Sequence, residues 1–164
     1  MEPSIQIYPI KQLYALLSND PRCAQNAVAI LSSSYTVQET KIPIPHITEI
    51  YDDVDREIPG RSLSTAAAHR IANFIKGMDP HVKTVFVCCD SGMSRSSAIA
   101  AVVHRFYGIN DSAIWNSPHY HPNPFVFRLL LECLDMPVDD AIIDRLIAIN
   151  RLSFKNAIRR SSNT

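Results

Sequence analysis

A short apolar run that ends at a cysteine, with a loop and a helix directly after it, constrains this chain more than any other segment. Residues 84–88 read Thr-Val-Phe-Val-Cys and are predicted as the central strand. Cys89 comes next, and a helix is predicted from Arg95 to Tyr107. In an open α/β sheet, ligands bind beyond the carboxyl ends of the strands, so this loop lies where a binding site is expected.

The loop has the size and composition to bind a phosphate group. Its five residues can wrap a tetrahedral dianion with their N–H groups inward, and the helix start adds unpaired N–H groups and the positive end of its dipole. Gly92 lies mid-loop, where positive φ or close backbone approach is expected. Arg95 can hold two phosphate oxygens through its planar guanidinium. The predicted substrate-binding residues are Asp90, Ser91, Gly92, Met93, Ser94 and Arg95.

The same surroundings favour Cys89 as a nucleophile. A free cysteine has a pKa near ~8.5, and positive surroundings lower it to about 3.5–7.5. Cys89 would then be a thiolate at neutral pH and could attack phosphorus. Ser96 could hydrogen-bond the sulfur and stabilise it as the leaving group of the second step. Cys88 is interpreted as a buried, inert residue that closes the core strand.

Cys89, Gly92, Arg95 and Ser96 form the pattern Cys-x-x-Gly-x-x-Arg-Ser. This pattern resembles the signature loop of the cysteine-dependent protein tyrosine and dual-specificity phosphatases, and all four defining positions match. The resemblance implies a phosphatase-like domain and a phosphocysteine intermediate. One position departs from the family, because Cys88 stands where a loop-ordering histidine is usual.

The resemblance also implies an aspartate general acid on a loop before the helix that precedes the signature strand. Such an acid protonates the leaving oxygen and contributes roughly 10²–10⁴-fold. We expect Asp53 first, Asp52 second and Asp55 third; a solvated acidic turn is the alternative for each. Asn123 matches a family asparagine that supports the signature loop, and a simple helix cap is the alternative for it.

Hydrophobic patterning predicts an α/β fold with a mostly parallel sheet flanked by helices, because strands and helices alternate. Ser62 or Ser64 is the expected cap of the second helix. The last residues, from Arg159, are expected to form a frayed tail. The predicted strands are residues 5–8, 27–31, 46–51 and 84–88, a polar loop covers 32–40, and the helices are 11–17, 62–76, 95–107, 111–115, 125–134 and 138–159.

Length and composition limit the domain organisation, partners, location and cofactors that can be expected. The chain, residues 1–164, is long enough for one domain with a substantial core. Sixteen basic residues balance sixteen acidic ones, which argues against nucleic-acid binding and membrane adsorption. Four cysteines do not form a disulfide scaffold, and no membrane span or signal peptide is evident, so a cytoplasmic location is expected. We expect no metal and no other cofactor, because the loop, the arginine and the acid manage the charge.

The sequence therefore predicts a hydrolase of phosphorylated proteins or small phosphomonoesters. Asp90 and the absence of lysine in the loop disfavour polyphosphorylated lipids. Two alternatives stay open: a pseudophosphatase that binds phosphorylated partners, and a rhodanese-like sulfurtransferase, whose loop is typically one residue shorter. Three further questions stay open. The substrate can carry phosphotyrosine, or phosphoserine or phosphothreonine, and the oligomeric state is not determined. An oxidised Cys89 could also be trapped as a disulfide by Cys23, Cys88 or Cys133.

Overall fold

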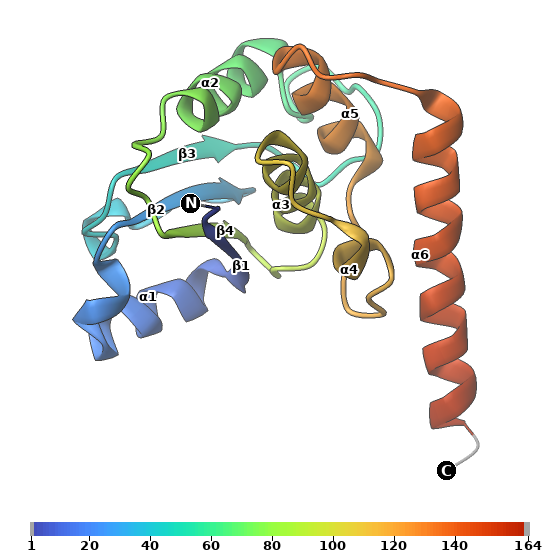
Figure 1. Cartoon of the computed structure of the whole chain (residues 1–164), viewed down its shortest axis with the longest axis horizontal. Coiled ribbons are helices and arrows are strands. Elements are labelled where there is room, and N and C mark those ends of the chain that lie inside the picture. The colour runs from blue at the N-terminus through green and yellow to red at the C-terminus, as the bar shows by residue number, and fades with distance from the viewer. Residues whose placement is uncertain (1, 163–164) are drawn as a thin grey trace.

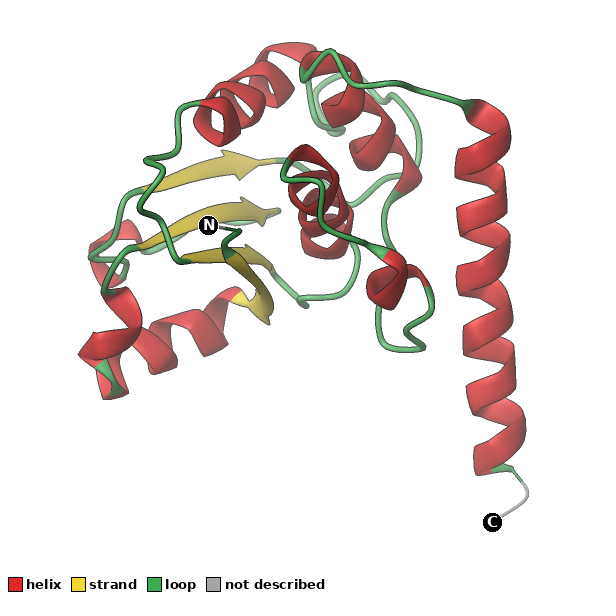
Figure 2. Ribbon diagram, viewed as in Figure 1, coloured by secondary structure: helices red, strands yellow, loops and turns green. Residues whose placement is uncertain are grey.

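Four parallel strands form the centre of the fold, and helices cover both faces (Figures 1 and 2). The computed structural model describes residues 2–162. The strand order is β1-β4-β2-β3, and each neighbouring pair is parallel. The carboxyl ends of the strands therefore meet at one edge of the sheet. The strands are β1 (Ser4–Pro9), β2 (Ala27–Ser33), β3 (His46–Ile50) and β4 (Thr84–Cys89).

The helices divide between the two faces of the sheet and give it two cores. On one face, α1 packs on alternate residues of β2 and β4, among them Leu31, Phe86 and Cys88. On the other face, α2, α3 and α5 pack on Val85 and Val87. In Figure 1, α6 lies at the side towards which the strands point; its Ile143 joins the core of this face, and its Asn150 donates to the carbonyl oxygen of Trp115. The helices are α1 (Ile10–Asn19), α2 (Thr65–Lys76), α3 (Arg95–Phe106), α4 (Ser112–Trp115), α5 (Pro124–Cys133) and α6 (Asp140–Ser161), with 3-10 turns at Pro21–Ala24 and Glu39–Lys41.

The structure confirms the predicted α/β class and parallel sheet, and it moves most of the predicted element boundaries by a few residues. Ser32 and Ser33 belong to β2 rather than to a loop, because they continue the pairing with β4 and β3. Helix α2 begins after Ser64, whose side chain accepts from the N–H of Ala67 at 3.2 Å. Ser62 instead bonds to Ile58. Of the two predicted caps, Ser64 is therefore the one that the helix uses.

The C-terminal end also differs from the prediction. Helix α6 continues through Ser161, so the expected frayed tail from Arg159 is wrong for the residues up to that point. The remainder of that tail, Asn163 and Thr164, lies outside the described residues. Within residues 2–162, every helix is too short or too polar to cross a membrane.

Candidate active site

The signature loop connects the carboxyl end of β4 to the start of α3. Gly92 has a φ of 70°, and a Cβ atom there would lie 2.7 Å from the backbone nitrogen of Pro9. The end of β1 therefore packs directly against the loop, and only glycine fits at this point. The expectation that the mid-loop glycine is required by its backbone is confirmed.

Cys89 is buried at the base of the loop, with its Sγ 3.1 Å from Oγ of Ser96. Burial raises the pKa of the Cys89 thiol, but hydrogen bonds from the Ser96 hydroxyl and from the backbone N–H groups of Ser96, Met93 and Gly92 outweigh it. The net result is a thiol pKa below the ordinary value. The loop thus stabilises a negative charge on the sulfur through several converging donors.

Cys88 has the opposite environment. Its side chain lies in the apolar core beside α1, where burial raises the pKa of its thiol to about 12. Neighbouring side chains of a strand point to opposite faces, so this thiol is turned away from the loop. Cys23, Cys88, Cys89 and Cys133 are all free thiols. The packing of Cys88 agrees with the structural interpretation of this residue.

Arg95 is held in a buried position at the start of α3. Its Nη1 donates to the carbonyl oxygen of Tyr51 at 2.6 Å and to Oγ of Ser34 at 3.1 Å. Its Nη2 donates to Oδ2 of Asp90 at 2.6 Å. Its Nε is buried and has no hydrogen-bond partner among the described residues. Buried N–H donors are nearly always paired, so this nitrogen marks a place where an anion would complete the site.

Of the three candidate acids, the structure brings Asp53 to the signature loop. Its Oδ1 accepts from Oγ of Ser94 at 2.9 Å and from Nδ2 of Asn123 at 2.7 Å. Asp52 instead pairs with Arg61 at 2.8 Å. Asp53 and Asp55 are both exposed, so the contacts with Ser94 and Asn123, rather than burial, distinguish Asp53. The geometry thus favours Asp53 among three candidate acids that sequence spacing alone does not rank.

Asn123 combines the two roles considered for it. Its Oδ1 accepts from the N–H of Val126 and caps α5, while its Nδ2 donates to Asp53 and to the carbonyl oxygen of Val54 at 2.9 Å. Its own backbone N–H donates to the carbonyl oxygen of Ser94 at 3.3 Å. Asn123 therefore joins the signature loop to the aspartate loop, which lies between β3 and α2 and contains Asp52, Asp53 and Asp55.

The other loop residues have exposed side chains, and hydrogen bonds hold the loop backbone. Ser91 is exposed, and Met93 is 42% exposed at the surface of the loop. The carbonyl oxygen of Met93 accepts from the Ser97 hydroxyl and from the N–H of His121. Backbone contacts, more than side chains, hold this part of the loop in shape.

Sequence reasoning missed the part of β2 that supports the site. The carboxylate of Asp90, expected near the substrate, accepts from the hydroxyl of Ser33, the N–H of Ser34 and Arg95. Tyr51 also contributes, through its carbonyl oxygen and a ring whose centroid lies 5.7 Å from Cζ of Arg95. A signal existed, because polar residues at the end of an apolar strand reach the same edge as the signature loop.

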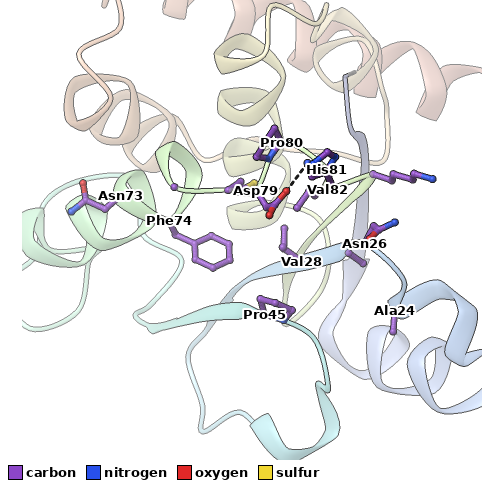
Figure 3. A pocket seen from close by; sticks show the side chains of 14 residues that line it. Ala24, Asn26, Val28, Pro45, Asn73, Phe74, Asp79, Pro80, His81 and Val82 are labelled. Atoms are coloured by element: carbon purple, nitrogen blue, oxygen red, sulfur yellow. Dashed lines mark hydrogen bonds between the residues drawn. The ribbon is translucent and has the colours of Figure 1, made fainter.

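One large cavity lies far from this chemistry. It has a volume of about 1180 Å³ and opens near the amino ends of β2 and β4, where Phe74, Val28 and Val82 form much of its wall (Figure 3). A smaller cavity, of about 470 Å³, is bordered by Asp53 and Ser94 beside the signature loop. Converging donors, rather than volume, identify the candidate active site.

One solved structure has the same architecture as this chain. No family model matches the chain, and no curated protein matches its sequence. Human DUSP28 superposes with a TM-score of 0.50 at 10% identity, over 96% of each chain. PTPMT1 superposes with a TM-score of 0.40 at 12% identity, over 98% of this chain and 96% of its own. PTPMT1 in complex with PI(5)P gives 0.43 at 13% identity, over 94% of each chain. The likeness to DUSP28, over nearly the full length, shows that this chain has the α/β fold of the protein tyrosine and dual-specificity phosphatases.

Proposed function

We propose that this protein is a cysteine-dependent phosphatase that hydrolyses phosphorylated proteins or small phosphomonoesters. The observation that carries the proposal is the Cys89 environment, in which Ser96 and the loop amides lower the thiol pKa despite burial. The unpartnered Nε of Arg95 supports it, because a bound phosphate would supply the missing acceptor. The fold is compatible with this activity, but the residues of the site carry the argument.

In the first step, the loop amides and Arg95 hold the phosphate oxygens while the Cys89 thiolate attacks phosphorus. A sulfur–phosphorus bond forms, and the bond from phosphorus to the substrate oxygen breaks. Asp53 donates a proton to that oxygen as it leaves. Both hydrogen bonds that the described residues make to Asp53 involve Oδ1, so Oδ2 is available for this transfer.

In the second step, water attacks the phosphocysteine. The Asp53 carboxylate accepts a proton from the water, phosphate forms, and the sulfur leaves as a thiolate. The Ser96 hydroxyl, 3.1 Å from the sulfur, stabilises that thiolate by donating a hydrogen bond. The enzyme returns to its starting state, and no metal takes part in either step.

The direct test is hydrolysis of p-nitrophenyl phosphate from pH 5 to 8 in the presence of a chelator. Wild-type protein should turn over, and Cys89→Ser should lose activity by a factor of about 10³ or more. Cys23→Ser, a change at a partly exposed thiol away from the loop, is the matched control and should retain activity. Rapid quenching should give a phosphate adduct on the peptide that contains Cys89.

Two results would contradict the proposal. Equal inertness of wild type and Cys89→Ser would favour a pseudophosphatase that only binds phosphorylated partners. Transfer of sulfur from thiosulfate to cyanide, without phosphatase activity, would favour the sulfurtransferase.

A further inference from the structure

An acidic residue inside a phosphate-binding loop needs an explanation, because its charge opposes that of the ligand. Asp90 follows Cys89 directly and is the one acidic residue among the five between Cys89 and Arg95. Its side chain is 30% exposed, and all of its hydrogen bonds run to neighbours that hold the loop. The contacts of Asp90 indicate a role in holding the loop rather than in touching the substrate.

The carboxylate of Asp90 joins the signature loop to the end of β2, a segment that is distant in sequence. Its Oδ1 accepts from the Ser33 hydroxyl at 2.5 Å. Its Oδ2 accepts from the N–H of Ser34 at 2.9 Å and from Nη2 of Arg95 at 2.6 Å. Burial raises the pKa of Asp90, but the hydrogen bonds from Ser33, Ser34 and Arg95 outweigh it and leave the pKa lowered. The side chain is therefore charged at neutral pH and ties the loop to the end of β2.

These contacts also fix the direction of the Arg95 guanidinium. Tyr51 and Ser34 take up Nη1, and Asp90 takes one hydrogen of Nη2. Among the described residues, Nε has no partner. Nη2 carries two hydrogens and makes one contact, with Asp90, so its second hydrogen is also available. A guanidinium held in this way presents a ready pair of donors, which lowers the ordering entropy that anion binding would otherwise require.

We propose that Asp90 is a positioning residue, which clamps Arg95 and the end of β2 into the arrangement that binds the phosphate oxygens. This role rests on the proposed phosphatase function. The positioning role and simple electrostatic repulsion predict opposite effects of Asp90 removal on anion affinity. If Asp90 acted only by repelling the anion, its removal would strengthen anion binding. If it positions Arg95, loss of its hydrogen bonds weakens anion binding although a negative charge is removed.

Two substitutions separate charge from hydrogen bonding. Asp90→Asn removes the charge but can keep every contact, because its carbonyl oxygen can accept from Ser34 and Arg95 while its NH₂ group donates to the Ser33 hydroxyl. Asp90→Ala removes all three contacts. Glu57→Gln makes the same charge change at an exposed position of the neighbouring aspartate loop and serves as the control.

The experiment measures tungstate binding by calorimetry in a Cys89→Ser background, together with the kinetics of p-nitrophenyl phosphate in the wild-type background. We expect Asp90→Ala to weaken tungstate binding at least tenfold, to raise KM and to lower kcat. Asp90→Asn and Glu57→Gln should stay within about threefold of the parent protein in tungstate affinity. Ser33→Ala, which removes one contact without a charge change, should fall between Asp90→Asn and Asp90→Ala. Thermal unfolding of each variant identifies any that is misfolded.

The outcomes distinguish this proposal from the catalytic one. Tighter tungstate binding by both Asp90 variants would overturn the positioning role in favour of repulsion. Unchanged binding by folded Asp90→Ala would overturn it as well. Tungstate binding without any wild-type turnover would refute the proposed hydrolysis while leaving the effect of Asp90 on affinity measurable. Absence of tungstate binding in the parent Cys89→Ser protein would overturn the positioning role itself.

Discussion

Cys88 and Cys89 are adjacent in sequence, yet they belong to two regions with opposite chemistry. Cys88 lies in the apolar core beside α1, and burial raises the pKa of its thiol to about 12. Cys89 is also buried, but Ser96 and the loop amides donate to its sulfur and lower its pKa. Burial is common to both, so the hydrogen-bond donors of the loop account for the difference.

This comparison shows how one strand can serve a core and a reactive site at once. The alternation of β4 places Phe86 and Cys88 against α1, and it places Val85 and Val87 against the helices of the other face. Cys89 comes where the strand ends and the N–H groups of the loop become available. The thiol with the lowered pKa therefore lies at the strand end, and its neighbour one position earlier is a core residue.

The largest expected difference between the two cysteines is in their alkylation rates. At pH 7 a thiol with a pKa of about 12 is ionised to roughly one part in 10⁵, so Cys89 should react with iodoacetamide at least about 10³ times faster than Cys88. Mass spectrometry of the two modified sites in time-resolved samples gives the rates. Comparable rates at the two positions would break the comparison.

The next largest effect should come from Asp53, the proposed general acid of the reaction at Cys89. Asp53→Asn should lower kcat for p-nitrophenyl phosphate by about 10²-fold, because the leaving oxygen loses its proton donor. Asp52→Asn, at the residue that pairs with Arg61, should change kcat by less than about threefold. Steady-state kinetics from pH 5 to 8 measure both. A larger loss in Asp52→Asn than in Asp53→Asn would reverse the assignment.

Local patterns were sufficient to predict the fold and to select Cys89 and Arg95 as the central residues of the candidate site. Strand-like and helix-like segments, and the spacing of Cys89 and Arg95, depend on residues close in sequence. The boundary of β2 was missed because polar Ser32 and Ser33 resemble a loop, and only their pairing with neighbouring strands makes them a strand. Pairing between distant segments is not visible in a single sequence.

The details that sequence left open are long-range hydrogen bonds. Asn123, seventy residues away along the chain, contacts Asp53 rather than Asp52, and no local pattern distinguishes these two aspartates. Asp90 accepts a hydrogen bond from Ser33, which lies fifty-seven positions away along the chain. The sequence places Asp90 beside the substrate, whereas its hydrogen bonds run to Ser33, Ser34 and Arg95. Both residues were found by pattern, but their partners depend on how the segments pack.

Ser96 tests whether donors to the sulfur explain the contrast between the two thiols. Ser96→Ala removes the side-chain hydrogen bond that lowers the pKa of Cys89, so this pKa should rise. At pH 6 to 7 a smaller fraction is then thiolate, and the rate of Cys89 alkylation should fall roughly tenfold. The pH midpoint of alkylation should move upward, towards that of an ordinary cysteine. An unchanged midpoint would mean that the loop amides alone control the thiol.

Cys88 should give the smallest effect on activity, because its contribution is to packing. Cys88→Ala leaves space in the α1-side core and should lower the free energy of unfolding by about 1–2 kcal/mol, with kcat within about threefold of wild type. Because its pKa is raised by burial, the neutral thiol stabilises the fold below the ordinary value of 9.0, and this contribution is lost as pH rises towards 12. Urea unfolding at pH 7 and pH 10 should therefore show a smaller stability gap between wild type and Cys88→Ala at the higher pH. A large loss of kcat with unchanged stability would instead give Cys88 a part in the chemistry of the loop and remove the distinction between the two cysteines.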